Sequence, residues 1–259
     1  RIVPRLRFKE FLNEEGWIFK KLSELARPIT NRAGDKKYPL LSIKSGYGLI
    51  SQIEKFGREI AGDSYKNYIV IKKGDFAYNK SATKQHPEGQ IALLENIEIA
   101  TVPNSIFSCF RVDRKLVKPE FLKYIFEKNT HGIWLRKFIS VGARANGALQ
   151  IDSADLFSLP IPITENEKEQ QKIANCLGSL DELIAVHTQK LEALKAHKKG
   201  LMEQLYPANR EKVPKLRFRE FVDDWVERTL ENKELILHHV FNILAYNTLF
   251  TCLILINNC

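Results

Sequence analysis

The chain has 259 residues, of which 44% are hydrophobic, and its formal net charge is +9 at pH 7. This apolar fraction is ordinary for a globular protein with a packed core, and it argues against a largely disordered chain. The excess of Lys and Arg favours a polyanionic partner, although a merely basic soluble protein is the plain alternative.

Four cysteines show neither a CxxC spacing nor a paired framework: Cys109, Cys176, Cys252 and Cys259. This usage fits a reduced, intracellular setting, so we expect a cytoplasmic protein in which Cys109 and Cys176 are buried as small apolar residues. We expect no signal peptide before the first domain. The chain begins on Arg1 rather than on methionine, so we expect the true N-terminus to be missing.

Residues 1–162 are predicted to form one mixed α+β domain. We expect a loose helix over 10–19, a helix over 119–128 that begins with Pro119, and further helix over 131–140 after a break at Gly132. The prolines of LFSLPIPIT should then extend the chain and close the domain. Short strands are predicted in six runs of β-like composition: YPLLSI, YGLISQI, YIVIKKGDFAYN, GQIALLEN, IEIATV and SIFSCFRVD.

Residues 163–206 are predicted to form one long helix. Thr164 and Glu167 have the spacing of a capping box at its start. Apolar residues then follow in steps of four and three, which is typical of a coiled-coil seam, and polar His187 and Lys198 interrupt it. We expect this rod of about 60 Å to pair with another helix rather than pack on its own domain. The residues predicted to mediate dimerisation are Ile173, Leu177, Leu180, Ile184, Leu191, Leu194, Leu201 and Leu205.

The beginning of the chain is repeated after this helix. Residues 3–11 read VPRLRFKEF and residues 213–221 read VPKLRFREF, and each copy continues through acidic residues to a tryptophan, Trp17 or Trp225. So long a spacing rules out a solenoid repeat and indicates a whole domain plus a connector. Residues 207–230 should therefore begin a second, truncated domain. Residues 231–259 form an apolar tail, which we interpret as translation past a rearrangement junction rather than as a membrane helix.

Three of these segments resemble the specificity subunits of type I restriction-modification systems: VPRLRFKEF, LPIPITENEKEQQKIANCL and KKGLMEQLYP. The resemblance covers about residues 3–206 and is looser inside the first domain, where YIVIKKGDFAYNKSA and SVGARANGALQI carry it. It implies that 1–162 is a target-recognition domain and that the helix is a spacer between two such domains. It also implies that the partners are double-stranded DNA, modification (methyltransferase) subunits and a restriction (translocase) subunit. S-adenosylmethionine, ATP and Mg²⁺ would be used by those subunits, and no cofactor or metal is expected in this chain.

The residues offer little support for catalysis. No P-loop, no GxGxxG turn between strand and helix and no Asn-Pro-Pro-aromatic motif is found. The six histidines are scattered along the sequence, and none pairs with a cysteine at the spacing of a metal site. Asp75 or Glu88 could each be read as part of a nuclease site, but the sequence shows no set of residues that would complete one. We therefore expect a DNA-recognition subunit that is not an enzyme.

Polar and basic side chains gather on three predicted turns of the first domain. Such side chains contact phosphates and base edges, although Gly, Asn, Ser and Lys also favour exposed turns for conformational reasons alone. The candidate DNA-binding residues are Lys44, Ser45, Tyr47, Tyr78, Asn79, Lys80, Ser81, Lys84, Arg144 and Asn146.

These observations predict a specificity subunit that reads one half of a bipartite target, with a homodimer replacing the missing second half. Two alternatives remain open. The chain could be a non-functional remnant of recombination between specificity genes, or a self-contained DNA methyltransferase or nuclease.

Overall fold

The computed structural model describes residues 1–59, 63–139, 149, 151–208 and 211–226, which fall into two compact units, Arg1–Leu183 and Ile184 onward. The elements of the first unit are η1 (Lys9–Phe11), β1 (Ile18–Lys21), α1 (Leu22–Leu25), β2 (Ala26–Pro28), β3 (Leu41–Lys44), β4 (Gly48–Ser51), α2 (Gln52–Phe56), η2 (Asp63–Asn67), β5 (Ile69–Lys72), β6 (Asp75–Asn79), β7 (Gln90–Leu93), β8 (Ile99–Val102), β9 (Phe107–Val112), α3 (Pro119–Glu127), α4 (Thr130–Leu135), α5 (Ser153–Phe157) and β10 (Pro160–Ile163). Helix α6 (Glu167–Leu205) begins in the first unit and ends in the second.

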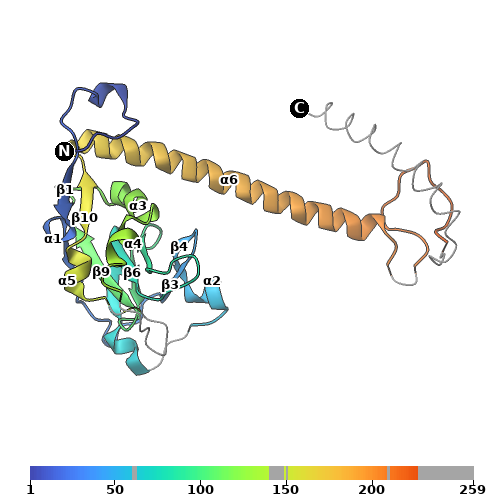
Figure 1. Cartoon of the computed structure of the whole chain (residues 1–259). Helices are drawn as coiled ribbons and strands as arrows, with labels where there is room; N and C mark the ends of the chain where they lie inside the picture. Colours follow the sequence, from blue (N-terminus) through green and yellow to red (C-terminus); the bar gives the residue numbers. More distant parts are fainter. Residues whose placement is uncertain (60–62, 140–148, 150, 209–210, 227–259) are drawn as a thin grey trace. The chain divides into compact units, whose positions relative to one another are not determined.

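A four-stranded antiparallel sheet, in the order β2-β9-β6-β7, organises the first unit (Figure 1). Because side chains alternate along a strand, its central strand β6 has two different faces. Phe76 and Tyr78 pack with α3 in one apolar cluster, whereas Ala77 packs in a second cluster with β3, β5 and β8. The rings of Phe76 and Phe110 stack 5.2 Å apart on the helical side. This mixed α+β core confirms the predicted fold class.

The six runs of β-like composition all contain a strand, although several of the strands end before their runs do. The YGLISQI run stops being a strand at Ser51, because the Ser51 hydroxyl accepts a hydrogen bond from Ile53 N at 3.2 Å and caps α2. Pro119 is the first residue of α3, as predicted. The break before α4 lies at Asn129 (φ 59°) rather than at Gly132, which is inside the helix.

The loose helix predicted over 10–19 is wrong. The segment has a single 3-10 turn, Lys9–Phe11, and then enters β1, which pairs antiparallel with β10. The LPIPIT sequence is thus a strand whose prolines lie opposite Phe19 and Lys21. Strands from the two ends of the domain lie side by side at the start of α6, which explains how the N-terminal segment reaches the helix (Figure 1).

The N-terminus of α6 is capped by Asn166, not by Thr164. The Asn166 side-chain oxygen accepts hydrogen bonds from the backbone of Lys168 at 3.0 Å and of Glu169 at 3.2 Å. Thr164 instead donates to the buried carboxylate of Glu169 at 2.7 Å. Because Thr164 is used in this way, the predicted capping box with Glu167 is incorrect.

Cys109 is buried, as expected, but Cys176 is exposed on α6, so that part of the cysteine prediction is wrong. Among the described residues, no helix is both long and apolar enough to cross a membrane. The apolar tail at 231–259 lies outside the described residues. The predicted domain boundaries stay predictions.

Candidate DNA interface

The turn between β3 and β4 presents the first group of predicted residues. Tyr47 N donates to Lys44 O at 3.0 Å, and Gly46 has φ 78°, a conformation that glycine adopts without strain. The Lys44 ammonium lies 4.1 Å from the centre of the Tyr47 ring, and 65% of Tyr47 is exposed. The turn therefore offers a cation and an aromatic ring to solvent.

The connection from β6 to β7 carries the second group and is held by its own hydrogen bonds. Asn79 Oδ1 accepts from Ser81 N at 2.9 Å, and Thr83 Oγ1 accepts from His86 N at 3.0 Å. Lys84 lies on the exposed surface of this connection. Asn79 and Ser81 are partly used in shaping the loop, so Lys84 is its more accessible polar group.

The two groups meet through one side-chain contact. Ser45 Oγ lies 2.9 Å from His86 Nε2, which joins the β3–β4 turn to the β6–β7 connection. The predicted residues Arg144 and Asn146 lie outside the described residues. The chain next to them is tied to the same place, because Leu149 N donates to Lys80 O at 2.8 Å.

Tyr78 is not a surface residue, so its predicted contact with DNA is wrong. Its side chain is fully buried, and its hydroxyl donates to Glu88 O at 2.8 Å. Burial, with a smaller contribution from Glu88, raises the pKa of the Tyr78 hydroxyl above its ordinary value. Tyr78 shares a strand face with Phe76, and this period-two pattern assigns both rings to the core.

Arg136 is a surface cation that the sequence did not single out. Its Nε donates to Glu88 Oε1 at 2.8 Å, and 70% of the Arg136 side chain is exposed while only 3% of the Glu88 side chain is. Burial disfavours the Glu88 carboxylate, but hydrogen bonds from Arg136 and Asn129 outweigh it, so the pKa of Glu88 is lowered. The carboxylate fixes one edge of the guanidinium and leaves the other toward solvent.

His86 was also missed, and it lies two residues from Glu88. Together these residues place Arg136 beside the connection that carries Lys84. No local pattern could have revealed either contact, because Ser45 and His86 are 41 positions apart and Glu88 and Arg136 are 48 apart.

The two acidic residues considered for a nuclease site, Asp75 and Glu88, have structural partners. Asp75 accepts two hydrogen bonds from the Arg111 guanidinium, at 2.6 and 2.8 Å, and one from Lys72 N at 2.6 Å. Among the described residues, no three His, Cys, Asp or Glu side chains gather as a metal site. Asp75 and Glu88 each hold an arginine and serve the fold at these positions.

The predicted dimerisation residues lie along α6 with graded exposure. Leu180, Ile184, Leu191 and Leu194 are between 51% and 64% exposed, whereas Leu177, Leu201 and Leu205 are half-buried. Ile173 packs against the core of the first unit, so for this residue a dimerisation role is corrected to a core role. The middle of the helix thus carries an apolar surface that the described part of the chain leaves exposed.

Comparison with known proteins gives a family. Residues 14–196 match the model of the type I restriction modification DNA specificity domain. The chain belongs to this family. It is also 24% identical over 231 residues to a putative type I restriction enzyme specificity subunit (MjaX) from Methanocaldococcus jannaschii, an alignment that covers 85% of the chain and 53% of the relative.

Solved structures share the fold. A chain from a study of complex assembly and conformational transition in the type I R-M system aligns over 82% of this chain and 53% of its own length, with 17% identity and a TM-score of 0.51. The HsdS subunit from Thermoanaerobacter tengcongensis aligns over 78% of this chain and 52% of its own, with 18% identity and a TM-score of 0.50. This chain therefore spans about half the length of the proteins it matches.

Proposed function

We propose that this chain is a half-length specificity subunit that binds double-stranded DNA and reads one half of a bipartite target. The carrying observation is the Ser45–His86 contact, which brings two loops with exposed cations to one end of the sheet. Lys44 and Lys84 have the chemistry to hold phosphates, and the oriented Arg136 has the forked donors that suit guanine. Loops mounted on a rigid sheet are a common place for such reading residues.

The proposal assigns recognition to this chain and catalysis to its partners. Modification subunits would methylate DNA with S-adenosylmethionine, and a restriction subunit would use ATP and Mg²⁺. Supporting this division, the sequence has no motif for either chemistry, and Asp75 and Glu88 are engaged with arginines. The family membership supports it as well.

A homodimer would supply the second half-site. Exposed leucines and an isoleucine along α6 support it, because a solvated helix gains nothing from an apolar stripe and a paired helix buries it. Two identical chains related by a two-fold axis would read a symmetric split sequence.

DNA selection by the full chain tests the reading function. Duplexes enriched from a random pool should share one sequence, and fluorescence anisotropy should show tighter binding to it than to a scrambled duplex. Arg136→Ala should cost about 1–3 kcal/mol on the selected duplex and little on the scrambled one. Lys44→Ala and Lys84→Ala should weaken both equally and each reduce the salt slope by about 1.

Lys73→Ala is the matched control, because Lys73 lies at the opposite end of β6 and pairs with Glu98 at 3.4 Å. If Lys73→Ala and Lys44→Ala lost the same DNA affinity, binding would depend on the overall positive charge of the chain and not on the two loops. If no sequence were enriched from the random pool, the proposal that this chain recognises a specific DNA sequence would be wrong.

A further inference from the structure

Helix α6 is held by the first unit along one side and over part of its length. Gln170 and Ala174 are buried and Gly178 is half-buried, whereas residues 181–199 are all exposed. Because these three positions follow one another in steps of four, and Asp181 comes three residues later, the four lie on one side of the helix. Asp181 is therefore the last position on this side that lies close to the first unit before the helix becomes fully exposed.

The beginning of this side is held tightly. Arg7 Nε donates to Glu169 Oε1 at 2.7 Å, and the two side chains are 3% and 1% exposed. Gln170 Oε1 accepts from Lys118 N at 2.8 Å, and Ala174 packs into the apolar cluster one turn later. We call these contacts the first anchor. They span only about 8 Å of the helix axis, so they fix the position of α6 better than its direction.

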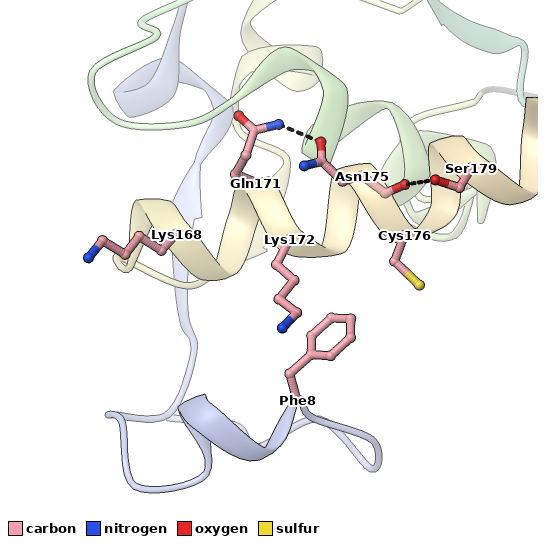
Figure 2. Close-up of a pocket in the computed structure, with 7 residues that line it drawn as sticks. All are labelled: Phe8, Lys168, Gln171, Lys172, Asn175, Cys176 and Ser179. Carbon is pink, nitrogen blue, oxygen red and sulfur yellow. Dashed lines mark hydrogen bonds between the residues drawn. The ribbon is translucent and has the colours of Figure 1, made fainter.

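A neighbouring side of the same turns adds little hold. Figure 2 shows polar side chains that bond along the helix itself: Gln171 Nε2 donates to Asn175 Oδ1 at 2.8 Å, and Ser179 Oγ donates to Asn175 O at 2.9 Å. Lys172 pairs with Glu10 of the N-terminal segment, again close to the first anchor. Bonds along a helix do not tie it to a domain, so this side leaves the direction of α6 to other contacts.

Two side chains of α3 meet α6 further along, at Asp181. The Tyr124 hydroxyl donates to Asp181 Oδ2 at 2.8 Å, and Lys123 Nζ donates to the same oxygen at 3.1 Å. Lys123 Nζ also donates to Glu95 Oε1 at 3.2 Å, just after β7. A Cβ on Gly178 would lie 3.6 Å from the Tyr124 hydroxyl, so the hydroxyl passes the helix at its smallest residue. We call these contacts the second anchor.

Charge and burial make the second anchor more than a loose surface contact. Burial disfavours the Lys123 ammonium, but Glu95 and the hydrogen bond to Asp181 outweigh it and raise the pKa of Lys123. Only 18% of the Lys123 side chain is exposed, compared with 47% of the Asp181 side chain. A shielded ammonium shared by two carboxylates has better defined geometry than an isolated exposed pair. The second anchor thus links β7 through α3 to α6.

We propose that the second anchor is a determinant of specificity: it fixes the direction of α6 and so sets how strictly the number of base pairs between two half-sites is selected. This inference rests on the bipartite reading proposed above. The two anchors are about 18 Å apart, and α6 continues for about 36 Å beyond Asp181 to Leu205. A shift of about 1 Å at Asp181, pivoting at Glu169, becomes about 3 Å at Leu205, close to the rise of one base pair, about 3.4 Å.

The second anchor is separate from the loops proposed to read DNA. Glu95 follows the last residue of β7, Leu93, whereas the β6–β7 connection with Lys84 enters the same strand at Gln90. Removing the anchor should therefore change the selection of spacing and leave the binding of a single half-site as it is. A residue that merely supported the fold would weaken both.

Double electron–electron resonance on the full chain tests the anchor itself. The chain has its exposed and C-terminal cysteines replaced, carries spin labels at Lys37→Cys and Lys190→Cys, and is diluted with unlabelled chain so that distances within one copy are measured. The replaced cysteines are Cys176→Ser, Cys252→Ser and Cys259→Ser. Asp181→Ala should widen the distance distribution about twofold, because the rod then pivots on the first anchor. Tyr124→Phe, which removes one of the two donors, should widen it less.

Two controls accompany this measurement. Glu182→Ala removes the same charge from the neighbouring exposed residue without touching the contact with α3, so the distribution should stay narrow. Labels at Lys37→Cys and Lys168→Cys should report the same width in every variant, because Lys168 lies beside the first anchor. Equal widening in Asp181→Ala and Glu182→Ala, or none in Asp181→Ala, would overturn the second anchor.

Competition among duplexes with different gaps tests the consequence. Two selected half-sites are separated by gaps of varied length, and the unaltered chain should prefer one length. Asp181→Ala should reduce its preference over a gap one base pair longer by about fivefold, while affinity for a single half-site stays unchanged. Widened distances with an unchanged gap preference would overturn the role in specificity. An unaltered chain without any gap preference would contradict the bipartite reading, and with it this use of the anchor, even if the distances widen.

Discussion

Among the described residues, Arg7 and Arg136 are each held by a buried carboxylate, and the two pairs differ in how much of the arginine stays exposed. Arg7 is 3% exposed on Glu169, whereas Arg136 is 70% exposed on Glu88. In the first pair both charges leave water, so the contact locks the N-terminal segment to α6. In the second, the carboxylate is buried and the cation stays solvated, so the contact orients Arg136 for a further partner.

The first pair should give the largest effect on stability. Glu169→Gln leaves the Arg7 guanidinium buried without its counter-charge, and breaking such a pair costs about 3–5 kcal/mol of unfolding free energy. Urea denaturation at pH 7, followed by circular dichroism, measures it. The matched control is Glu165→Gln: Glu165 pairs with Lys20 at 2.7 Å but is 62% exposed, so little should change.

The pH dependence of this pair has a defined sign. Burial opposes the charge on Glu169, but hydrogen bonds from Arg7, Thr164 and Trp17 outweigh it and lower its pKa in the folded state. The carboxylate therefore contributes stability above its unfolded pKa and loses it as the pH falls through the folded one. Glu169→Gln should flatten the stability curve in the acid range, and an unflattened curve would contradict the assignment.

The polar cluster behind Arg136 should give the next largest effect. Burial lowers the pKa of His131 from 6.5 to about 4, while Gly89 O and Glu88 act in the opposite direction. Folding then favours neutral His131, so stability is complete above pH 6.5 and is lost as the pH falls toward 4. Between pH 7 and pH 5 the loss should be about 2 kcal/mol.

Urea denaturation of the His131→Phe variant checks this, because phenylalanine keeps a ring against Phe126, whose ring centre is 6.1 Å away, and removes the titration. The variant should lose at least 1 kcal/mol less than the parent between pH 7 and pH 5. Parallel curves for the two proteins would show that His131 does not carry the effect.

Local patterns predicted the elements of this fold well. Pro119 marks the start of α3, and the Gly74 turn separates β5 from β6, because both depend on neighbouring residues. The helix expected over 10–19 failed because Ile18 enters β1, and Ile18 pairs with Ile163 of β10, far away in the sequence. Pairings over such separations depend on the whole domain, and no local pattern encodes them.

The residues of the candidate site also fall into those that local sequence patterns predict and those that depend on distant contacts. The sequence found the exposed turn of Lys44 and Tyr47 because glycines and polar residues mark turns. It placed Tyr78 on the surface although Phe76 and Tyr78 share one side of a strand, a pattern that was available. It missed His86 and Arg136, since their importance comes from contacts with distant residues.

The smallest expected effect on stability is that of Glu88→Gln. This variant tests whether Glu88 orients Arg136 for DNA, in contrast to Glu169, which fixes the N-terminal segment to α6. Glu88→Gln retains an oxygen that can accept from Arg136 but removes the charge that orients it. Because Arg136 is already mostly solvated, unfolding free energy should fall by less than in Glu169→Gln. Preference for the selected duplex over a scrambled one should drop by about 1 kcal/mol, roughly fivefold, while binding to the scrambled duplex is unchanged. Anisotropy titrations of both duplexes measure this, and an equal loss on the two would mean that Glu88 supports the loop rather than the reading of bases.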